Sequence, residues 1–205
     1  MPRVSADVRR DLLVEAAIRV MVRDGVAKAT TRSIVAEAEM PLGAFHYCFR
    51  SKEELLNHVI EAISGHTLDR AMEALQQPGT LEEQLTGALD AYWQHLVENP
   101  DEHRVTYELT SYAVRQPGLE HMARKQYENY IHTFTAVLEM LAVNASVRWA
   151  TPVPVLARYA TAMVDGLTLL WLNEGGDDGL ARAALANAMG YLLGQAVPAA
   201  TAATG

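Results

Sequence analysis

The sequence of 205 residues contains one cysteine, Cys48, and no apolar segment of the kind that targets a chain to a membrane. A single cysteine excludes an intramolecular disulfide framework and favours a reducing compartment. The N-terminus lacks the apolar run of a signal peptide, and the longest uncharged stretch, 183–205, is broken by glycine, proline and amide side chains. We therefore expect a cytoplasmic protein without a membrane-spanning segment.

Positive charge is also scarce. The chain has 17 Lys and Arg against 25 Asp and Glu, a net charge of −8, which argues against nucleic-acid binding when it is read over the whole chain. Residues 1–60, however, carry nine basic and eight acidic side chains, whereas residues 61–205 carry eight basic and seventeen acidic ones. The acidity belongs to the later part, so the first sixty residues remain compatible with binding to DNA.

The common signatures of catalytic and metal sites are missing as well. The sequence contains no nucleophile elbow, no phosphate-binding glycine loop and no HExxH pair. Its histidines do not occur at the spacing of metal ligands, and Cys48 is isolated from them. We expect no catalytic residue, no metal and no cofactor.

What dominates the sequence is helical periodicity, while alternating strand patterns are nearly absent. Capping residues such as Thr30, Ser51 and Thr80, and breaks such as Gly25, divide the pattern into nine helices. The predicted fold is all-α, with three short helices followed by a larger helical bundle. The expected limits are a head over 1–50, a body for ligand binding and dimerisation over 51–196, and a disordered tail over 197–205.

Two of the short helices, predicted over 31–38 and 41–48, have helix-turn-helix dimensions. Phe45 and Phe49 point toward the core of this motif, which leaves another face of the second helix free to enter a major groove. Threonine and basic side chains flank it at helix N-termini, where phosphates bind well. The residues expected to contact DNA are Thr30, Thr31, Arg32, Leu42, Gly43, Ala44, His46, Tyr47 and Lys52.

Three assignments in this region have alternatives. Tyr47 fits either a base or phosphate contact or a packing role. Arg3, Arg9 and Arg10 fit either an arm that reaches DNA or solvated charge at a chain end. Lys52 fits either a phosphate contact or a surface ion pair with a residue one turn away.

The residues from Thr30 to Leu55 resemble the N-terminal signature of the tetracycline-repressor (TetR) family. They read TTRSIVAEA, and then GAFHYCFRSKEEL at the same offset as in that family. The remainder of the chain resembles the family only as an all-helical body. The resemblance implies a homodimeric DNA-binding regulator, expected to be a repressor, that binds a palindromic operator and is released by a small apolar or aromatic ligand.

Several positions depart from the family pattern. Glu39 stands where the turn glycine is usual, so it must accept a left-handed backbone at a cost of about 1 kcal/mol. Pro41 replaces a serine at the start of the second helix. His46 and Cys48 replace a tyrosine and a histidine or tyrosine, at positions to which the resemblance gives phosphate-facing roles.

The body holds most of the aromatic and methionine side chains, which suit either a core or an adaptable apolar pocket. The resemblance implies a small-molecule pocket there, and the expected ligand contacts are Trp93, Tyr107, Tyr127, Tyr130 and Met163. It also implies that two subunits meet through the last two helices. The expected dimer contacts are Leu156, Ala160, Met163, Leu167, Trp171, Leu185, Ala188 and Leu192.

Two other classes of function remain open at this level. The first is an enzyme or carrier that uses the apolar bundle and keeps the head as a scaffold. The second is a protein-interaction module that has lost DNA binding, for which the changes at Glu39, Pro41 and Cys48 give a reason.

Overall fold

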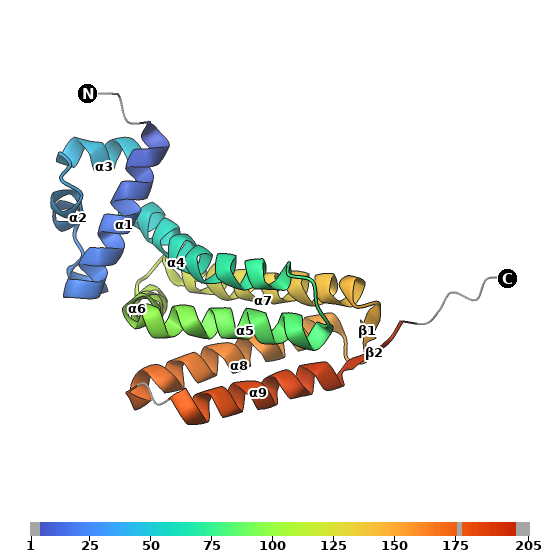
Figure 1. Cartoon of the computed structure of the whole chain (residues 1–205). Coiled ribbons are helices and arrows are strands. Elements are labelled where there is room, and N and C mark those ends of the chain that lie inside the picture. The colour runs from blue at the N-terminus through green and yellow to red at the C-terminus, as the bar shows by residue number, and fades with distance from the viewer. Residues whose placement is uncertain (1–4, 176–177, 200–205) are drawn as a thin grey trace. The chain divides into compact units, whose positions relative to one another are not determined.

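The computed structural model describes residues 5–175 and 178–199 (Figure 1). These ranges contain nine α-helices, one short 3₁₀ helix and two three-residue strands, which confirms the all-α prediction. The elements are α1 (Ala6–Asp24), η1 (Val26–Lys28), α2 (Thr31–Glu37), α3 (Leu42–Cys48), α4 (Lys52–Leu75), α5 (Leu81–Glu98), α6 (Pro100–Arg115), α7 (Glu120–Asn144), β1 (Val147–Trp149), α8 (Val153–Glu174), α9 (Asp178–Gly194) and β2 (Ala196–Pro198).

Helix ends follow local side-chain chemistry. The Thr30 hydroxyl accepts from the Ser33 amide at 3.1 Å, and the Ser33 hydroxyl in turn accepts from the Thr30 amide. A second capping box joins Thr80 and Glu83, with the Glu83 carboxylate accepting from the Thr80 amide at 2.8 Å. Gly25 ends α1 with a φ of 83°, a value that glycine adopts at little cost. These ends match the predicted ones because they depend on neighbouring residues.

Contacts divide the chain into two compact units. The first ends at Leu68 and resumes over Glu98–Gln126, and the second covers Asp69–Val97 and the chain from Tyr127 onward. Helices α4 and α7 therefore each contribute residues to both units. This division follows packing alone, so the functional limits expected from the sequence, 1–50 and 51–196, stay a prediction.

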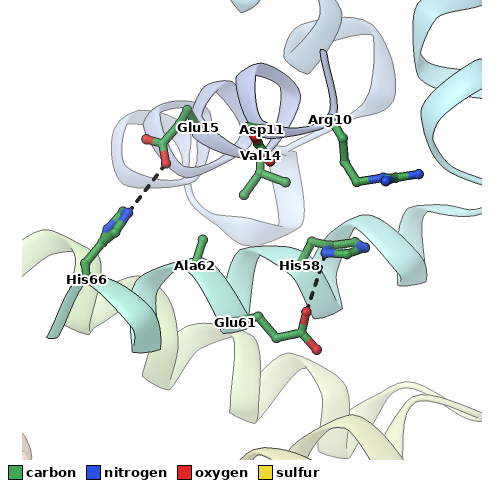
Figure 2. A pocket seen from close by; sticks show the side chains of 8 residues that line it. All are labelled: Arg10, Asp11, Val14, Glu15, His58, Glu61, Ala62 and His66. Carbon is green, nitrogen blue, oxygen red and sulfur yellow. Dashed lines mark ion pairs between the residues drawn. The ribbon is translucent and has the colours of Figure 1, made fainter. Parts of the chain in front are cut away.

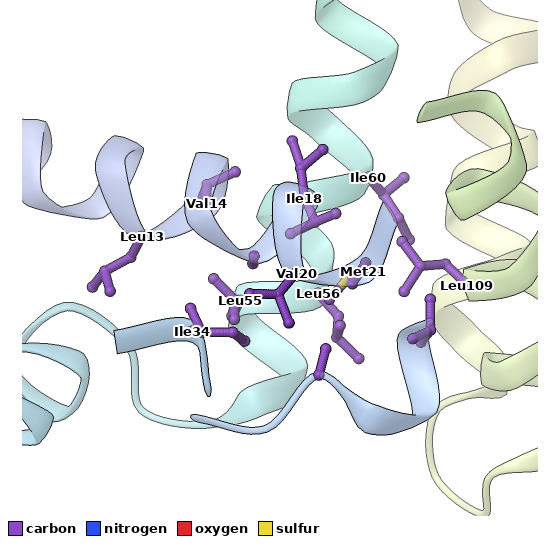
Figure 3. Close-up of a cluster of buried hydrophobic side chains, with 14 of the residues drawn as sticks. Leu13, Val14, Ile18, Val20, Met21, Ile34, Leu55, Leu56, Ile60 and Leu109 are labelled. Carbon is purple, nitrogen blue, oxygen red and sulfur yellow. The ribbon is translucent and has the colours of Figure 1, made fainter. Parts of the chain in front are cut away.

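The core of the first unit is built mainly by α1. Its apolar face packs against α2, α3, the start of α4, and α6, as Figure 3 shows for Leu13, Met21, Ile34, Leu55 and Leu109. Each of these side chains is at most 1% exposed, and burying one stabilises the fold by about 2 kcal/mol. Helix α6, from later in the chain, thus packs on α1, the same helix against which α2 and α3 pack.

In the second unit α8 packs against α9. Leu138, Leu156, Ala160 and Leu192 form one buried cluster of this unit, and the Trp149 indole N–H donates to the Leu138 carbonyl at 2.9 Å. Helix α8 is the one helix among the described residues that is long and apolar enough to cross a membrane. Helices in the core of a protein can have the same length and composition, and 44% of the most apolar 18-residue segment of α8 is buried inside the chain.

The C-terminal segment corrects one expectation. Residues from Val197 were expected to be disordered, but β2 pairs antiparallel with β1, with Arg148 opposite Val197. The Ala199 amide also donates to the Ser146 carbonyl at 3.2 Å. Strands of three residues are too short to show an alternating pattern, so this pairing could not be predicted from the sequence. The rest of the predicted tail, 200–205, lies outside the described residues.

Candidate nucleic-acid interface

The turn between α2 and α3 is closed by backbone hydrogen bonds. The Met40 amide donates to the Val35 carbonyl at 2.8 Å, and the Glu39 amide donates to the Ala36 carbonyl at 3.1 Å, which is the Schellman arrangement. Glu39 has a φ of 54°, as predicted for the position where a glycine is usual. Pro41, expected as the first helical residue, is instead the N-cap of α3. The turn therefore keeps its shape without either usual residue.

Helix α3 has one buried and one exposed face. Phe45, Cys48 and the following Phe49 are at most 4% exposed and anchor the helix to the core of the first unit. On the opposite face Leu42 is 43% exposed and Tyr47 is 68% exposed. Large apolar side chains this accessible on an anchored helix are available to a binding partner.

The other expected contact residues of α3 also lie outside the core. His46 and Gly43 are exposed and Ala44 is half-buried. A Cβ atom placed on Gly43 would meet no atom within 4 Å, so its surroundings are open. Cys48, for which the resemblance implied a phosphate-facing role, is buried, and this expectation is wrong. It fails because Cys48 lies one turn after the inward-facing Phe45.

Threonine and arginine mark the N-terminus of α2. Thr30 and Arg32 are exposed and Thr31 is half-buried. The Thr30 hydroxyl is already used as the helix cap, and the positive end of the helix dipole lies at this terminus. Phosphate groups bind well at such a position.

Lys52, at the start of α4, is directed toward the protein. Its Nζ lies 5.8 Å from the centroid of the Tyr112 ring, and burial lowers the pKa of its ammonium group. Of the nine expected DNA contacts, Lys52 is therefore the one whose charge is partly engaged within the chain.

Two arginines left open by the sequence have different environments. The Arg10 guanidinium donates to the Cys48 carbonyl at 3.4 Å and lies 5.9 Å from the Phe49 centroid, so it ties α1 to the end of α3. The Arg9 guanidinium lies 5.8 Å from the centroid of the exposed Tyr47 ring. Arg9 therefore joins the exposed face of α3, and Arg3 lies outside the described residues.

Arg50 is a further candidate contact that sequence reasoning missed. Its side chain is exposed directly after α3. Within residues 5–175 and 178–199, no carboxylate pairs with the side chain of Arg9, Arg32 or Arg50. The position of Arg9 beside Tyr47 could have been found only from the fold, because the two residues are distant in sequence.

Ion pairs hold α2 against α1. Arg19 Nε lies 3.0 Å from Glu37 Oε1, and Arg23 Nη1 lies 2.7 Å from Glu37 Oε2. These hydrogen bonds, with Arg23 contributing most, lower the pKa of the Glu37 carboxyl. Two arginines of the head are thus engaged by the chain's own carboxylates and are less available to phosphate.

A pocket of about 340 Å³ lies between α1 and α4, as Figure 2 shows. Six of its eight lining residues are titratable, and they include Glu15, Glu61 and His66. His66 Nδ1 lies 3.2 Å from the Glu102 carboxylate, and its Nε2 lies 3.6 Å from that of Glu15, so His66 links α4 to both α6 and α1. No group of three or more His, Cys, Asp or Glu in the described part of the chain is arranged to hold a metal ion.

The expected ligand contacts are distributed over both units. Tyr107 lies on α6 in the first unit, whereas Trp93, Tyr127, Tyr130 and Met163 belong to the second. The rings of Tyr127 and Tyr130 are in edge contact, with centroids 5.7 Å apart. Trp93 is 1% exposed and is a core residue of α5.

Sequence reasoning missed the polar partners of these aromatic residues. The Tyr127 hydroxyl donates to Asp165 Oδ2 at 2.9 Å, and the Trp93 indole donates to Asp178 Oδ1 at 3.4 Å. Neither aspartate shows a sequence signal, because each meets its aromatic partner across helices.

Most of the expected dimer contacts face the interior of the chain itself. Six are at most 7% exposed, and Met163 and Leu167 are half-buried; the six are Leu156, Ala160, Trp171, Leu185, Ala188 and Leu192. For these six the expected place on an open surface is wrong, while the dimer contacts of Met163 and Leu167 stay a prediction. Other apolar side chains of α8 and α9 are exposed instead, namely Val155 (57%), Leu169 (44%), Leu170 (52%), Leu180 (78%) and Tyr191 (45%). Both faces of these helices are apolar, so periodicity did not separate them.

Comparison with known proteins agrees with this geometry. Residues 13–59 match the family described as bacterial regulatory proteins of the tetR family, and residues 81–195 match the C-terminal domain of BetI-type transcriptional repressors. The first match covers the whole helix-turn-helix, and the second covers more than half of the chain.

Individual relatives extend the similarity over most of the chain. The HTH-type nicotine-responsive transcriptional repressor HdnoR of Paenarthrobacter nicotinovorans is 28% identical over 181 residues, covering 85% of this chain and 89% of that protein. The HTH-type transcriptional regulator BetI of Rhizobium meliloti (strain 1021) is 33% identical over 90 residues, covering 43% of this chain and 44% of that protein.

A solved structure shows the same fold. The crystal structure of a TetR-family regulator from Rhodococcus sp. superposes with a TM-score of 0.73 at 19% identity, covering 91% of this chain and 99% of that one. With a matching family over both parts of the sequence and an exposed recognition helix, the chain belongs to the TetR family and is a ligand-responsive, DNA-binding transcriptional regulator.

Proposed function

We propose that this regulator is a cytoplasmic repressor that binds a palindromic operator as a homodimer, with α3 in the major groove. The observation that carries the proposal is the exposed face of α3, where Leu42, His46 and Tyr47 project from a helix anchored by Phe45 and Phe49. An anchored helix with one free face is what direct readout of base edges requires.

Phosphate contacts would come from around this helix. Thr31 and Arg32 lie at the N-terminus of α2, Arg50 follows α3, and Arg9 lies beside Tyr47. Because the first sixty residues have nearly balanced charge, affinity depends on these placed contacts and on two-fold symmetry more than on bulk attraction.

Dimerisation would use the exposed apolar side chains of α8 and α9. Val155, Leu169 and Leu170 of α8, with Leu180 and Tyr191 of α9, form what we call the outer stripe. A stripe of this kind is covered at a stable subunit interface, and a two-fold axis makes the same stripe meet itself. The two copies of α3 would then meet half-sites about one helical turn apart.

Release would follow from binding of a small molecule to the second unit. The relative from Paenarthrobacter nicotinovorans is named as nicotine-responsive, which supports a small effector for this chain too. An effector changes operator affinity only by the ratio of its affinities for the DNA-bound and free forms of the protein.

The experiment begins with selection of duplexes from a random pool and measurement of binding by fluorescence anisotropy at several salt concentrations. Replacing Arg32 by Ala should weaken binding to all duplexes alike and reduce the salt slope by about 1. Replacing Tyr47 by Ala should instead reduce the preference for the selected sequence, and Tyr47→Phe separates the ring from the hydroxyl.

The matched control for Arg32 is Arg115→Ala, which removes an exposed arginine of α6. Equal losses in Arg32→Ala and Arg115→Ala would show that only bulk charge matters and would contradict the proposed docking. Failure of the unaltered protein to select any duplex at low salt would contradict DNA binding itself.

A further inference from the structure

Three tyrosines and one carboxylate meet on three helices of the second unit. Tyr127 of α7 donates its hydroxyl to Asp165 Oδ2 of α8 at 2.9 Å, and its ring makes an edge contact with that of Tyr130. From α5, the Tyr92 hydroxyl lies 2.5 Å from the hydroxyl oxygen of Thr168, one turn after Asp165. Residues far apart in sequence thus assemble one polar and aromatic cluster.

This cluster is electrostatically negative. Asp165 supplies a carboxylate, and the faces of the phenol rings add the partial negative charge of their π systems. Burial, followed by the charge of Asp165, raises the pKa of the Tyr127 hydroxyl well above its ordinary value. Burial is also the main cause of the raised pKa of Tyr92, with Tyr130 and Asp165 contributing. These surroundings disfavour another negative charge and favour a positive one.

The four side chains are neither fully exposed nor fully buried. Tyr92, Tyr127, Tyr130 and Asp165 are all half-buried, whereas neighbouring Thr168 is 1% exposed. A half-buried carboxylate interacts more strongly with a ligand charge than a fully solvated one, because water screens it less. Partial exposure also leaves part of each side chain accessible to a small molecule.

Another aspartate of the same unit has a structural role and provides a comparison. Asp178 Oδ1 accepts from the indole N–H groups of Trp93 at 3.4 Å and Trp171 at 2.9 Å. Its second carboxylate oxygen lies 3.7 Å from Arg182 Nε. Asp178 therefore joins α5, α8 and α9 through two indoles and a cation, whereas Asp165 accepts from the Tyr127 hydroxyl.

We propose that Asp165, with Tyr92, Tyr127 and Tyr130, is the recognition group for a small organic ammonium ion. The ammonium N–H donates to the Asp165 carboxylate, and the carbon atoms next to the nitrogen contact the faces of the tyrosine rings. The inference rests on the proposed effector response of the second unit, for which it names the chemical class of the ligand.

The test compares amines with neutral molecules of the same shape. A panel of small arylalkyl amines and cyclic tertiary amines, each paired with the alcohol of the same skeleton, is screened by thermal shift, because ligand binding raises the melting temperature by mass action. The tightest amine is then titrated calorimetrically into the unaltered protein, Asp165→Asn and Tyr127→Phe. The matched control is Glu139→Gln, which neutralises an exposed carboxylate of α7.

We expect at least one amine to bind and its alcohol to bind at least tenfold more weakly. Asp165→Asn should weaken amine binding at least tenfold, with an unchanged circular dichroism spectrum, while Glu139→Gln leaves it unchanged. Tyr127→Phe keeps the aromatic ring and should weaken amine binding less than Asp165→Asn does. A panel in which no amine binds, or amine binding that survives in Asp165→Asn, would overturn the inference.

Operator binding by the same samples separates this inference from the proposed function. Amine binding by a protein that selects no duplex would support the ammonium site and contradict the regulator. Operator binding by a protein that binds no amine would support the regulator and contradict the ammonium site.

Discussion

At the scale of single residues, Glu39 shows how the turn of the helix-turn-helix tolerates an unusual side chain. The two Schellman hydrogen bonds require a left-handed backbone at this position, and Glu39 adopts it with a φ of 54°. The side chain is exposed, so its Cβ strain is local and is not relieved by packing. The buried Ile34 and Phe45 on either side of the turn hold the conformation instead.

Replacing Glu39 by Gly should therefore stabilise the protein. Removing the Cβ atom from a left-handed position is expected to raise the free energy of unfolding by about 1 kcal/mol. Glu39→Gln is the matched control, because it removes the same charge and keeps the Cβ atom. Urea denaturation measures both variants, and equal stabilities of the two would contradict a cost that comes from the backbone.

At the scale of elements, helix ends were easier to predict than helix partners. The caps at Thr30 and Thr80 involve residues three positions apart, so their chemistry can be read from the sequence. The inward direction of Phe45 and Phe49 was also predictable, because residues four positions apart lie on the same face of a helix. Contacts such as that of Glu37 with Arg19 and Arg23 were not, because they join α2 to α1 across the fold.

The contact between α1 and α2 should make stability depend on pH. Since Arg23 and Arg19 lower the pKa of Glu37 in the folded state, its stabilising effect is present above the carboxyl's ordinary pKa of about 4.3 and is lost as pH falls through the lower folded-state value. The difference in unfolding free energy between the unaltered protein and Glu37→Gln should thus shrink as pH falls below the carboxyl's ordinary pKa.

Urea denaturation at a series of pH values measures this difference. Glu139→Gln is the control, because it neutralises an exposed carboxylate of α7 that lies outside the contact between α1 and α2. A difference that stays constant from neutral to acidic pH would show that the two ion pairs do not stabilise the fold.

At the scale of the whole molecule, the second unit shows where periodicity alone was insufficient. Helices α8 and α9 are apolar on more than one face, and six of the eight residues expected at the dimer surface instead belong to the chain's own interior. Only the packing of α8 on α9 reveals which apolar side chains remain accessible. The ammonium site has the same origin, because Tyr92, Tyr127 and Asp165 come from three helices.

A charge in the outer stripe should separate the subunits. Leu170 is 52% exposed on α8, and a glutamate there would be buried without a partner at a two-fold interface. Leu170→Glu should elute as one chain of 22.5 kDa at concentrations where the unaltered protein has twice that mass. Val143→Glu, at a 78% exposed position of α7, is the control. Light scattering after size exclusion measures the masses, and a dimeric Leu170→Glu would place the interface elsewhere.

The most direct test of the regulator is the symmetry of the DNA site that it protects. The unaltered protein should select a duplex with two inverted half-sites about one helical turn apart and protect both, with two chains per duplex. Inserting five base pairs between the half-sites turns one of them to the opposite face and should abolish this joint protection. A single protected half-site, or protection that is insensitive to the insertion, would contradict a dimer that reads DNA through two copies of α3.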